Sequence, residues 1–431
     1  MKTILLFGAG KSATCLIDYL LVHAPSNDWR LLVADSNLTL AQSKVAGAAN
    51  AAAVATDIKD ELQRAELINQ SDIVISMLPA ALHILVARTC LALGKHLLTA
   101  SYADNDIRQM SEEIKEKGLL FLCEMGLDPG IDHMSAMRII HAIQNKGGKI
   151  TSFHSHCGGL VAPESDNNPW HYKISWNPRN VVLAGKSGAV YKKSGKVATL
   201  PYEQLFVDNP AVNIPGLGAY AWYPNRDSLA YSVLYHLQDT ETFVRTTLRH
   251  PDFCKGWSKI VELGLTDDQV VLDTDTMTYA GLTRLHFRQK ADITPETALQ
   301  REMLEYLGLY DDRLIGNGSQ TAAAVLQGLL ETKLALHPAD KDMIIMLHEF
   351  EYLQDGVHKK TDSCLVVKGE DSLRTAMAKT VGLPLAIAVK LILQNTISLT
   401  GLHIPVLAEI YDPVLEELAK EGISFMEMVK V

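Results

Sequence analysis

The chain opens with a short apolar run that leads directly into a glycine-rich turn. Residues 3–7 read Thr-Ile-Leu-Leu-Phe, residues 8–13 read Gly-Ala-Gly-Lys-Ser-Ala, and an apolar helical pattern follows over residues 14–22. A second apolar run, residues 30–34, ends at Asp35. This order of strand, turn, helix and strand, with an acidic residue closing the second strand, is typical of the Rossmann fold that binds dinucleotides.

Each small residue of the turn has a physical role. Gly8 permits the tight turn, Gly10 lets backbone amides approach a pyrophosphate, and Ala13 allows the helix and strand to pack closely. The start of the helix adds free amides and the positive end of its dipole. The alternative is a glycine turn in an α/β protein that binds no cofactor.

Asp35 bears on which nicotinamide cofactor is used. A carboxylate at the end of the second strand can accept hydrogen bonds from both adenosine-ribose hydroxyls and repels a 2′-phosphate. No arginine occurs in residues 36–43, so the sequence predicts that NAD is preferred over NADP. Lys11 is the one nearby cation that could support NADP, and Asp35 could instead be a solvated residue of a turn.

Further apolar runs alternate with helical patterns up to about residue 125, which predicts a parallel, doubly wound sheet. Residues 150–249 are richer in Gly, Pro, Asn, Tyr and Trp, and residues 252–336 are mainly helical. We therefore predict an α/β protein with a Rossmann domain over 1–130 and a mixed α/β substrate domain over 131–259 and 340–394. A small helical insertion would cover 260–339, and a tail over 395–431 would pack back on the first domain.

Composition restricts the partners. The 431 residues carry a net charge of −10 and no basic stretch, which argues against a nucleic-acid partner. The six cysteines form no C-x-x-C pair, so we expect reduced thiols in a cytoplasmic protein and no metal site. The most apolar late stretch, 381–393, contains Pro384 and Lys390, and we expect no membrane span there.

Residues 124–133 read Glu-Met-Gly-Leu-Asp-Pro-Gly-Ile-Asp-His and follow the fifth apolar run. Ligands of doubly wound sheets bind at the carboxyl edge of the strands, where this motif is expected. Asp128 and His133 are therefore candidate acid/base groups. Asp132 could simply cap the following helix, and His133 could be a satisfied interface residue.

Residues 126–133 resemble the saccharopine reductase family, the glutamate-forming saccharopine dehydrogenases of lysine metabolism. The resemblance covers nearly the whole chain and is weakest between about 260 and 340. The other matching segments are 99–102, 157–160, 162–165, 172–176, 223–228, 247–249 and 377–390. The resemblance implies a Rossmann domain, a mixed α/β saccharopine-binding domain and a small helical insertion.

The resemblance also implies the positions of ligand contacts. Cofactor contacts would fall on Gly8, Ala9, Gly10, Lys11, Ser12, Asp35, Ser36, Asn37, Asp57, Ile58, Leu78, Ala100, Ser101, Leu127, Pro129 and Asn177. Substrate contacts would fall on Ser101, Tyr102, Asp128, Arg226, Thr247, Leu248 and Arg249. The two arginines suit a substrate with several carboxylates, because a guanidinium group can bind a carboxylate bidentately.

Catalytic roles are open among three polar residues. Asp128, Tyr102 and Cys157 are the candidates for acid/base work, although Cys157 could be inert packing. The implied reaction moves a hydride from the lysine ε-carbon of saccharopine to a nicotinamide. The resulting imine is hydrolysed to L-glutamate and 2-aminoadipate 6-semialdehyde, or the reverse reaction condenses and reduces.

Other readings of the sequence stay open. Well-known fungal family members carry an arginine where this sequence has Asp35 or Ser36, and they use NADP; the absence of that arginine favours NAD here. A related enzyme of the carboxynorspermidine dehydrogenase type would act on polyamines, and a dinucleotide-binding protein without catalysis is a third alternative. A small substrate with several carboxylates and a homodimer are the partners left open, with no membrane and no nucleic acid.

Overall fold

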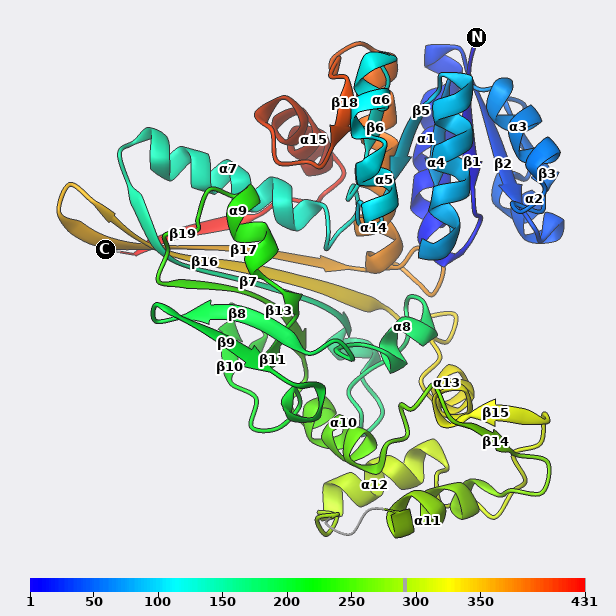
Figure 1. Ribbon diagram of the computed structural model, residues 1–431, viewed down its shortest axis with the longest axis vertical. Helices are drawn as coiled ribbons and strands as arrows, with labels where there is room; N and C mark the ends of the chain where they lie inside the picture. The colour runs from blue at the N-terminus through cyan, green and yellow to red at the C-terminus, as the bar shows by residue number, and fades with distance from the viewer. Residues whose placement is uncertain (290–292, 431) are drawn as a thin grey trace. The chain divides into compact units, whose positions relative to one another are not determined.

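The computed structural model describes residues 1–289 and 293–430, and it divides into two compact units (Figure 1). Unit 1 comprises Met1–Lys146 and Leu373–Phe425, and unit 2 comprises Gly147–Ser372 and Met426–Val431. The segments predicted above for 260–339 and 395–431 include residues 290–292 and 431, which lie outside the described residues.

Within the described residues, unit 1 is built on a seven-stranded sheet of order β18-β6-β5-β4-β1-β2-β3. All neighbouring strands run parallel. The order reverses between β1 and β4, which is the switch point where ligands bind in such sheets. The predicted Rossmann fold is confirmed. The strands are β1 (Lys2–Phe7), β2 (Trp29–Asp35), β3 (Ala51–Ala55), β4 (Ile73–Ser76), β5 (His96–Thr99), β6 (Leu120–Leu122) and β18 (Gly401–His403).

The central strand β1 shows how an apolar sequence suits the middle of a parallel sheet. Ile4, Leu5 and Leu6 are all 0% exposed, as expected of a strand covered on both faces. The covering helical elements are η1 (Lys11–Ala13), α1 (Thr14–Asn27), α2 (Leu38–Val45), α3 (Glu61–Asn69), η2 (Ala80–Leu82), α4 (His83–Leu93), α5 (Asn105–Gln109), α6 (Ser111–Glu116), α7 (Ile131–Asn145), α14 (Ala376–Leu393) and α15 (Ala408–Lys420).

Two helices belong to unit 1, whereas the sequence analysis placed them in the second domain. α7 packs on α15, and α14 packs on α1 and η1. At Gly382 the backbone of α14 approaches α1 so closely that an added Cβ would lie 3.0 Å from the Leu16 amide nitrogen. The predicted boundaries therefore differ from the structure at residues 131–146 and 373–394.

The C-terminal tail is shared between the two units. β18 adds to the edge of the parallel sheet beside β6 (Figure 1), and α15 packs on α7 and α14. The last strand, β19 (Met426–Lys430), instead pairs with β17 (Val357–Lys368) of unit 2. The part of the tail up to Phe425 belongs to unit 1 and the part from Met426 on to unit 2, whereas the sequence analysis expected all of 395–431 to pack back on the first domain.

α14 is the one helix among the described residues that is long and apolar enough to cross a membrane. Pro384 lies inside this helix and does not end it. In the protein, 72% of the helix is buried. Because it also packs against α1, α14 serves as a core helix of unit 1.

Unit 2 contains, in the described part of the chain, a ten-stranded mixed sheet. Its main path is β10-β11-β13-β7-β16-β17-β19, with β8, β9 and β12 attached beside it. β7 runs parallel to β13 and antiparallel to β16. The further strands are β7 (Lys149–Val161), β8 (Ala189–Lys193), β9 (Lys196–Leu200), β10 (Ala211–Ile214), β11 (Gly218–Pro224), β12 (Arg226–Asp227), β13 (Thr242–Arg249) and β16 (Asp342–Gln354).

The helices of unit 2 surround an aromatic core. Trp170 and Trp257 are 0% and 1% exposed, and the ring of Phe253 stacks on Trp257 at 5.2 Å between centroids. Leu304 and Tyr223 belong to the same core, so the predicted helical insertion is packed into unit 2. The elements are η3 (Pro163–Ser165), α8 (Pro178–Val182), η4 (Tyr202–Gln204), α9 (Leu229–Leu234), α10 (Pro251–Leu263), β14 (Val271–Asp273), α11 (Tyr279–Gln289), α12 (Ala298–Leu307), β15 (Ser319–Thr321) and α13 (Ala322–Lys333).

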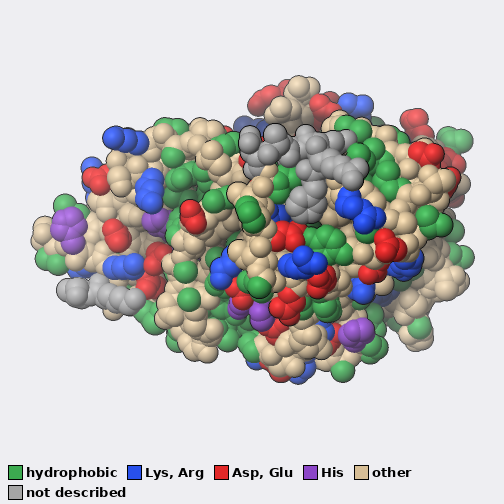
Figure 2. All heavy atoms as spheres, turned by 90° about the horizontal axis from the view of Figure 1, so that it is seen from below, with side chains coloured by type: hydrophobic (Ala, Val, Ile, Leu, Met, Phe, Trp, Pro, Cys, Tyr) green, Lys and Arg blue, Asp and Glu red, His purple; other side chains and the backbone are tan. Residues whose placement is uncertain are grey.

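The surface charge is mixed. On the face shown in Figure 2, Lys and Arg side chains are interspersed with Asp and Glu side chains. Such mixing gives no field of one sign on this face. The absence of a nucleic-acid partner stays a prediction.

Candidate active site

The predicted cofactor residues of unit 1 follow successive strands of the parallel sheet. Residues 8–12 follow β1, residues 35–37 end and follow β2, and residues 57–58 follow β3. Leu78 follows β4, Ala100 and Ser101 follow β5, and Leu127 and Pro129 follow β6. Because the carboxyl ends of parallel strands share one edge of the sheet, these loops gather at the switch point.

The two glycines of the turn have different surroundings. Gly8 has a φ of +102°, and an added Cβ would lie 2.8 Å from the Met77 carbonyl oxygen. Gly10 has a φ of −62°, and an added Cβ would have no atom within 4 Å. No side chain of the described residues caps the turn at Gly10. This open, uncapped start of η1 and α1 fits the pyrophosphate of a dinucleotide.

Asp35 turns toward the backbone of its own neighbourhood. Its Oδ2 accepts a hydrogen bond from the Ala9 amide at 2.7 Å, and its Oδ1 accepts one from the Asn37 amide at 2.8 Å. Both oxygens therefore join the glycine turn to the loop after β2. Each oxygen keeps a further lone pair, so the expected role of Asp35 as the acceptor for ribose hydroxyls stays a prediction.

Glu124 connects the two loops that carry Tyr102 and Asp128. It is 0% exposed, and its Oε2 lies 3.0 Å from His133 Nε2. Its Oε1 accepts a hydrogen bond from the Ala103 amide at 3.2 Å. His133 is thus a satisfied buried residue, which was the second interpretation of its sequence position. Glu124 has a φ of +60°, a strained conformation that no pattern in the sequence indicated.

Asp132 does not cap α7 in the way the sequence suggested. The helix begins after Gly130 without a side-chain cap. The Oδ1 atom of Asp132 instead accepts a hydrogen bond from the Gly130 amide at 2.6 Å. Asp132 therefore holds the turn that precedes the helix, and Asp128, which lies on that turn, is partly buried.

The predicted substrate residues of unit 2 lie on adjacent strands. Thr247 on β13 is paired with Cys157 on β7 and with Tyr223 on β11. Leu248 and Arg249 are the last residues of β13. The structure therefore brings Cys157, Thr247, Leu248 and Arg249 to one region of unit 2.

Two other predicted residues of unit 2 have local features of their own. Arg226 is exposed and begins β12 with a φ of +50°. A side chain held in this left-handed region is strained, which is frequent at functional sites. Asn177 accepts a hydrogen bond from the Arg179 amide at 3.0 Å and caps α8. Asn177 lies in unit 2, apart in the chain from the cofactor loops of unit 1.

Arg249 is a buried cation with no ion pair among the described residues. It is 4% exposed, its Nε has no hydrogen-bond partner, and its Nη1 donates to the Leu248 carbonyl at 2.8 Å. Its guanidinium carbon lies 5.3 Å from the ring centroid of Tyr172 and 5.5 Å from that of Phe253. Burial opposes the charge, whereas the nearby phenols of Tyr223 and Tyr172 favour it, and the pKa of Arg249 is raised.

A buried charge without a partner costs several kcal/mol, roughly the penalty of removing one ion from water. Aromatic faces offset part of that cost for Arg249 but supply no negative charge. An anionic ligand would supply it. Arg249 therefore marks a site for a carboxylate or another small anion.

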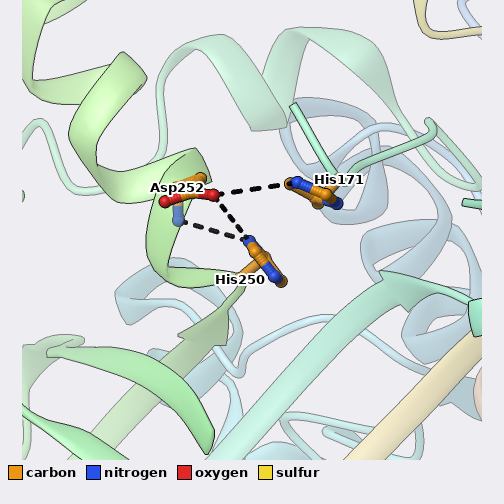
Figure 3. A group of neighbouring side chains, drawn as sticks. All are labelled: His171, His250 and Asp252. Atoms are coloured by element: carbon orange, nitrogen blue, oxygen red, sulfur yellow. Dashed lines mark hydrogen bonds and ion pairs between the residues drawn. The ribbon is translucent and has the colours of Figure 1, made fainter. Parts of the chain in front are cut away.

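Two histidines and two aspartates lie next to this arginine. Figure 3 shows His171, His250 and Asp252 turned toward one another. The Nε2 of His171 lies 3.8 Å from Asp252 Oδ2, and the His250 Nδ1 lies 4.0 Å from the same oxygen. The other ring nitrogen of His171 lies 2.6 Å from Asp166 Oδ2. These residue types can bind a metal ion.

Several ligand atoms of this cluster already have partners. His250 Nδ1 accepts a hydrogen bond from the Asp252 amide at 3.3 Å, and Asp252 Oδ1 pairs with Lys255 at 2.8 Å. The two imidazole rings lie 3.9 Å apart between centroids, with their planes 30° from parallel. We interpret the cluster as a brace between the loop with Tyr172 and the start of α10 with Phe253, the two rings beside Arg249.

Gly158 keeps β7 close to β13 beside Arg249. An added Cβ would lie 2.7 Å from the Leu248 Cβ and 2.9 Å from the Leu248 carbonyl oxygen. We expect Gly158→Ala to destabilise the protein by about 1–3 kcal/mol, because hydrogen-bonded strands cannot separate to admit the methyl group. Thermal unfolding measures the loss. Gly328→Ala in α13, where an added Cβ meets nothing within 4 Å, is the control and should not lower Tm. Equal Tm values for the two variants would contradict the prediction.

Comparison with known proteins identifies the family. The model of the saccharopine dehydrogenase NADP binding domain matches residues 4–122, and that of the saccharopine dehydrogenase C-terminal domain matches residues 126–423. The chain belongs to the saccharopine dehydrogenase family. The resemblance stated from its motifs is thereby confirmed.

Individual relatives match most or all of the chain. The L-glutamate-forming, NADP(+) saccharopine dehydrogenase of Saccharomyces cerevisiae is 34% identical over 99% of this chain and 99% of its own length. The solved structure of the apo, histidine-tagged yeast enzyme matches with a TM-score of 0.89 at 32% identity, over 100% of both chains. The alpha-aminoadipic semialdehyde synthase of Arabidopsis thaliana is 34% identical over 93% of this chain, which spans only 41% of that protein.

The prediction that NAD is preferred was wrong. The matching N-terminal family model is described as NADP-binding, and the yeast dehydrogenase carries NADP(+) in its name. The physical reason lies in Asp35, whose two oxygens are bound by the Ala9 and Asn37 amides. A carboxylate satisfied in this way is a weaker barrier to a 2′-phosphate than the free acceptor assumed from the sequence.

Proposed function

We propose that this chain oxidises saccharopine to L-glutamate and 2-aminoadipate 6-semialdehyde with NADP+ and water, or catalyses the reverse reductive condensation. Family membership supports the reaction class, an oxidoreductase acting on a CH–NH bond. The observation that supports saccharopine as the substrate is the burial of Arg249. Its guanidinium group has no ion pair among the described residues. Saccharopine has three carboxylates, and one of them would supply the missing negative charge.

The cofactor, when bound, accepts the hydride; the residues of this chain bind, orient and move protons. The open turn at Gly10 would hold the pyrophosphate through backbone amides. The secondary amine of saccharopine must be unprotonated before hydride leaves, and Asp128 is the carboxylate proposed to take that proton. Tyr102 and Cys157 are the other polar groups proposed to hold the proton or to orient the water that hydrolyses the imine.

The remaining substrate contacts are proposals of the same kind. Arg226 would bind a second carboxylate, and Thr247, Leu248 and Ser101 would line the site. Support for Arg226 comes from its strained backbone, with a φ of +50°. The cofactor contacts proposed beyond the glycine turn are Asp57, Ile58, Leu78, Ala100, Leu127, Pro129 and Asn177.

Location and assembly are also proposals. We propose a cytoplasmic protein, supported by six cysteines that are all free thiols in the structure. A small substrate with several carboxylates is the proposed partner. A homodimer is proposed for testing by light scattering of the purified protein.

Lys11 is the residue proposed to favour NADP. It is exposed at the start of η1, next to the open turn. We expect Lys11→Met to raise KM for NADP+ about tenfold or more, because a charge-assisted contact to phosphate contributes about 1.5–3 kcal/mol. KM for NAD+ should change little. Steady-state kinetics with both cofactors measure the effect, with Lys2→Met at the amino end of β1 as the control. An equal loss with NAD+ would instead assign Lys11 to the pyrophosphate.

A direct assay tests the proposed function. Purified protein is mixed with saccharopine and NADP+, the absorbance of reduced nicotinamide is followed, and L-glutamate is identified as a product. Saccharopine-dependent reduction supports the proposal. Activity with carboxynorspermidine alone would make the chain a polyamine dehydrogenase, and no activity in either direction with either substrate would leave a dinucleotide-binding protein. Both outcomes would overturn the proposal.

A further inference from the structure

A buried histidine joins two serines at the switch point of unit 1. His83, the first residue of α4, lies with its Nδ1 2.8 Å from the hydroxyl of Ser76 at the end of β4. Its Nε2 lies 2.7 Å from the hydroxyl of Ser101, just after β5. Ser76 is 0% exposed and His83 is 3% exposed. Ser101 is only partly buried, so this row of hydrogen bonds ends at a residue that a ligand can reach.

The backbone holds both ends of this row in place. The Ser101 amide donates to the Thr99 hydroxyl at 3.2 Å, and the Glu124 amide donates to the Ser101 carbonyl at 3.0 Å. Ser76 is a residue of β4, which is paired with β1 and β5. The freedom that remains at Ser101 is therefore the direction of its hydroxyl.

The imidazole of His83 is neutral near pH 7. Burial lowers its pKa to about 4, against a smaller opposing effect of the Asp104 carboxylate. A neutral imidazole has one N–H and one lone pair, so it donates to one serine and accepts from the other. The Ser76 and Thr99 hydroxyls, 2.8 and 3.5 Å from Nδ1, are 0% and 1% exposed, so neither brings a proton into direct contact with solvent. The row of hydrogen bonds orients a hydroxyl and does not carry protons away.

We propose that His83 is a positioning residue that donates its Nε2–H to the Ser101 oxygen and thereby turns the Ser101 hydroxyl proton toward a substrate carboxylate. This inference rests on the proposed function, in which Ser101 contacts saccharopine. In the opposite tautomer Ser101 would donate to His83 and present only lone pairs, which repel an anion. A substrate rich in carboxylates selects the first tautomer, with Ser76 donating to Nδ1.

Two substitutions of His83 test the hydrogen bonds of its two ring nitrogens separately. The side-chain amide of His83→Gln can reach the place of Nε2 and donate to Ser101, whereas that of His83→Asn reaches only the place of Nδ1 and Ser76. We expect His83→Gln to keep kcat/KM for saccharopine within about threefold of wild type. His83→Asn and Ser101→Ala should each lower it about tenfold, mainly through KM, as expected for one hydrogen bond to a charged group.

His141→Asn is the matched control. Its Nδ1 also bonds a hydroxyl, that of Tyr411 at 2.6 Å, but it lies on α7 and contacts no proposed ligand residue. Its kcat/KM should equal that of wild type. The pH profile is a second readout: since the pKa of His83 is about 4, wild type and His83→Gln should share one acid limb above pH 5. An ionisation near pH 6.5 that disappears in His83→Gln would overturn the inference.

The double variant decides between positioning and mere packing. In the Ser101→Ala background, His83→Asn should cause no further loss, because the hydroxyl it positions is gone. Additive losses would overturn the inference while leaving the proposed function standing. If wild type does not oxidise saccharopine, the proposed function fails. The Kd of NADP+ is then measured for wild type, the two single variants and the double variant. Coupling between the two sites would then keep the positioning role for cofactor binding, and additivity would overturn it.

Discussion

Replacing Arg249 with methionine should raise the thermal stability of the protein while it removes most of its activity on saccharopine. The stability gain is expected because Arg249 is 4% exposed and pairs with no carboxylate among the described residues. Methionine fills a similar narrow space between Tyr172 and Phe253 without a charge to desolvate. The activity loss is expected because the substrate carboxylate would lose its buried partner. We expect kcat/KM to fall about 100-fold, equivalent to about 3 kcal/mol.

The opposite signs of these two effects make the test sharp. Tm is measured by calorimetry without substrate, and KM is measured by the reduced-nicotinamide assay. Arg284→Met is the control, since Arg284 is 63% exposed and faces Asp312 at 3.6 Å; neither quantity should change. Arg249→Lys should lie between wild type and Arg249→Met in KM, because an ammonium cannot bind a carboxylate bidentately. A lower Tm together with an unaltered KM in Arg249→Met would show that Arg249 is a structural residue.

The second large effect is expected at the glycine turn, where substitutions of Gly8 and Gly10 should have different consequences. Gly10→Ala should leave the fold intact and weaken NADP+ binding at least about tenfold, or about 1.4 kcal/mol. The added methyl group meets no protein atom within 4 Å and enters the space proposed for the pyrophosphate. Gly8→Ala should instead lower Tm by several degrees, since its φ is +102° and its Cβ would press on the Met77 carbonyl.

Thermal unfolding without cofactor and isothermal titration with NADP+ measure the two outcomes on the same preparations. The prediction requires Gly10→Ala to match wild type in Tm and to lose affinity. If Gly10→Ala keeps full affinity, the dinucleotide does not approach this turn. If both variants lose stability equally, the open space at Gly10 is absent in solution.

The Rossmann unit could be predicted because its signals are local. Its signals lie within the first 35 residues: the apolar run of β1, the glycines that follow it and Asp35. Each of them indicates local backbone structure without reference to distant residues. The assignment of α7 and α14 could not be predicted in this way. A buried helix shows where its apolar face is but not which sheet it covers, and the close approach of Gly382 to Leu16 is visible only in three dimensions.

The same limit applies to the site. The motifs predicted Arg249 as a carboxylate partner, but not that its charge would be left unpaired within unit 2. The cofactor prediction from Asp35 was wrong because its Oδ2 accepts a hydrogen bond from the Ala9 amide. Ala9 lies 26 positions away, so no pattern in the sequence indicated this bond. His83 gave no sequence signal, since its serine partners stand 7 and 18 positions away, one at the end of β4 and the other just after β5. Distances of this kind depend on the order of strands in the sheet.

The division of the chain between the units sets the order in which the protein can be completed during synthesis. Unit 1 begins at Met1 but needs residues 373–425, whereas unit 2 is assembled from the segment between them and closed by β19. While the ribosome makes unit 2, the nascent Rossmann sheet still lacks β18, and α1 lacks the cover of α14. Unit 1 is thus completed only after the segment of unit 2 that separates its two parts has been made. Until α14 has been made, the face of α1 that α14 covers stays uncovered, and exposed apolar surface of this kind favours aggregation.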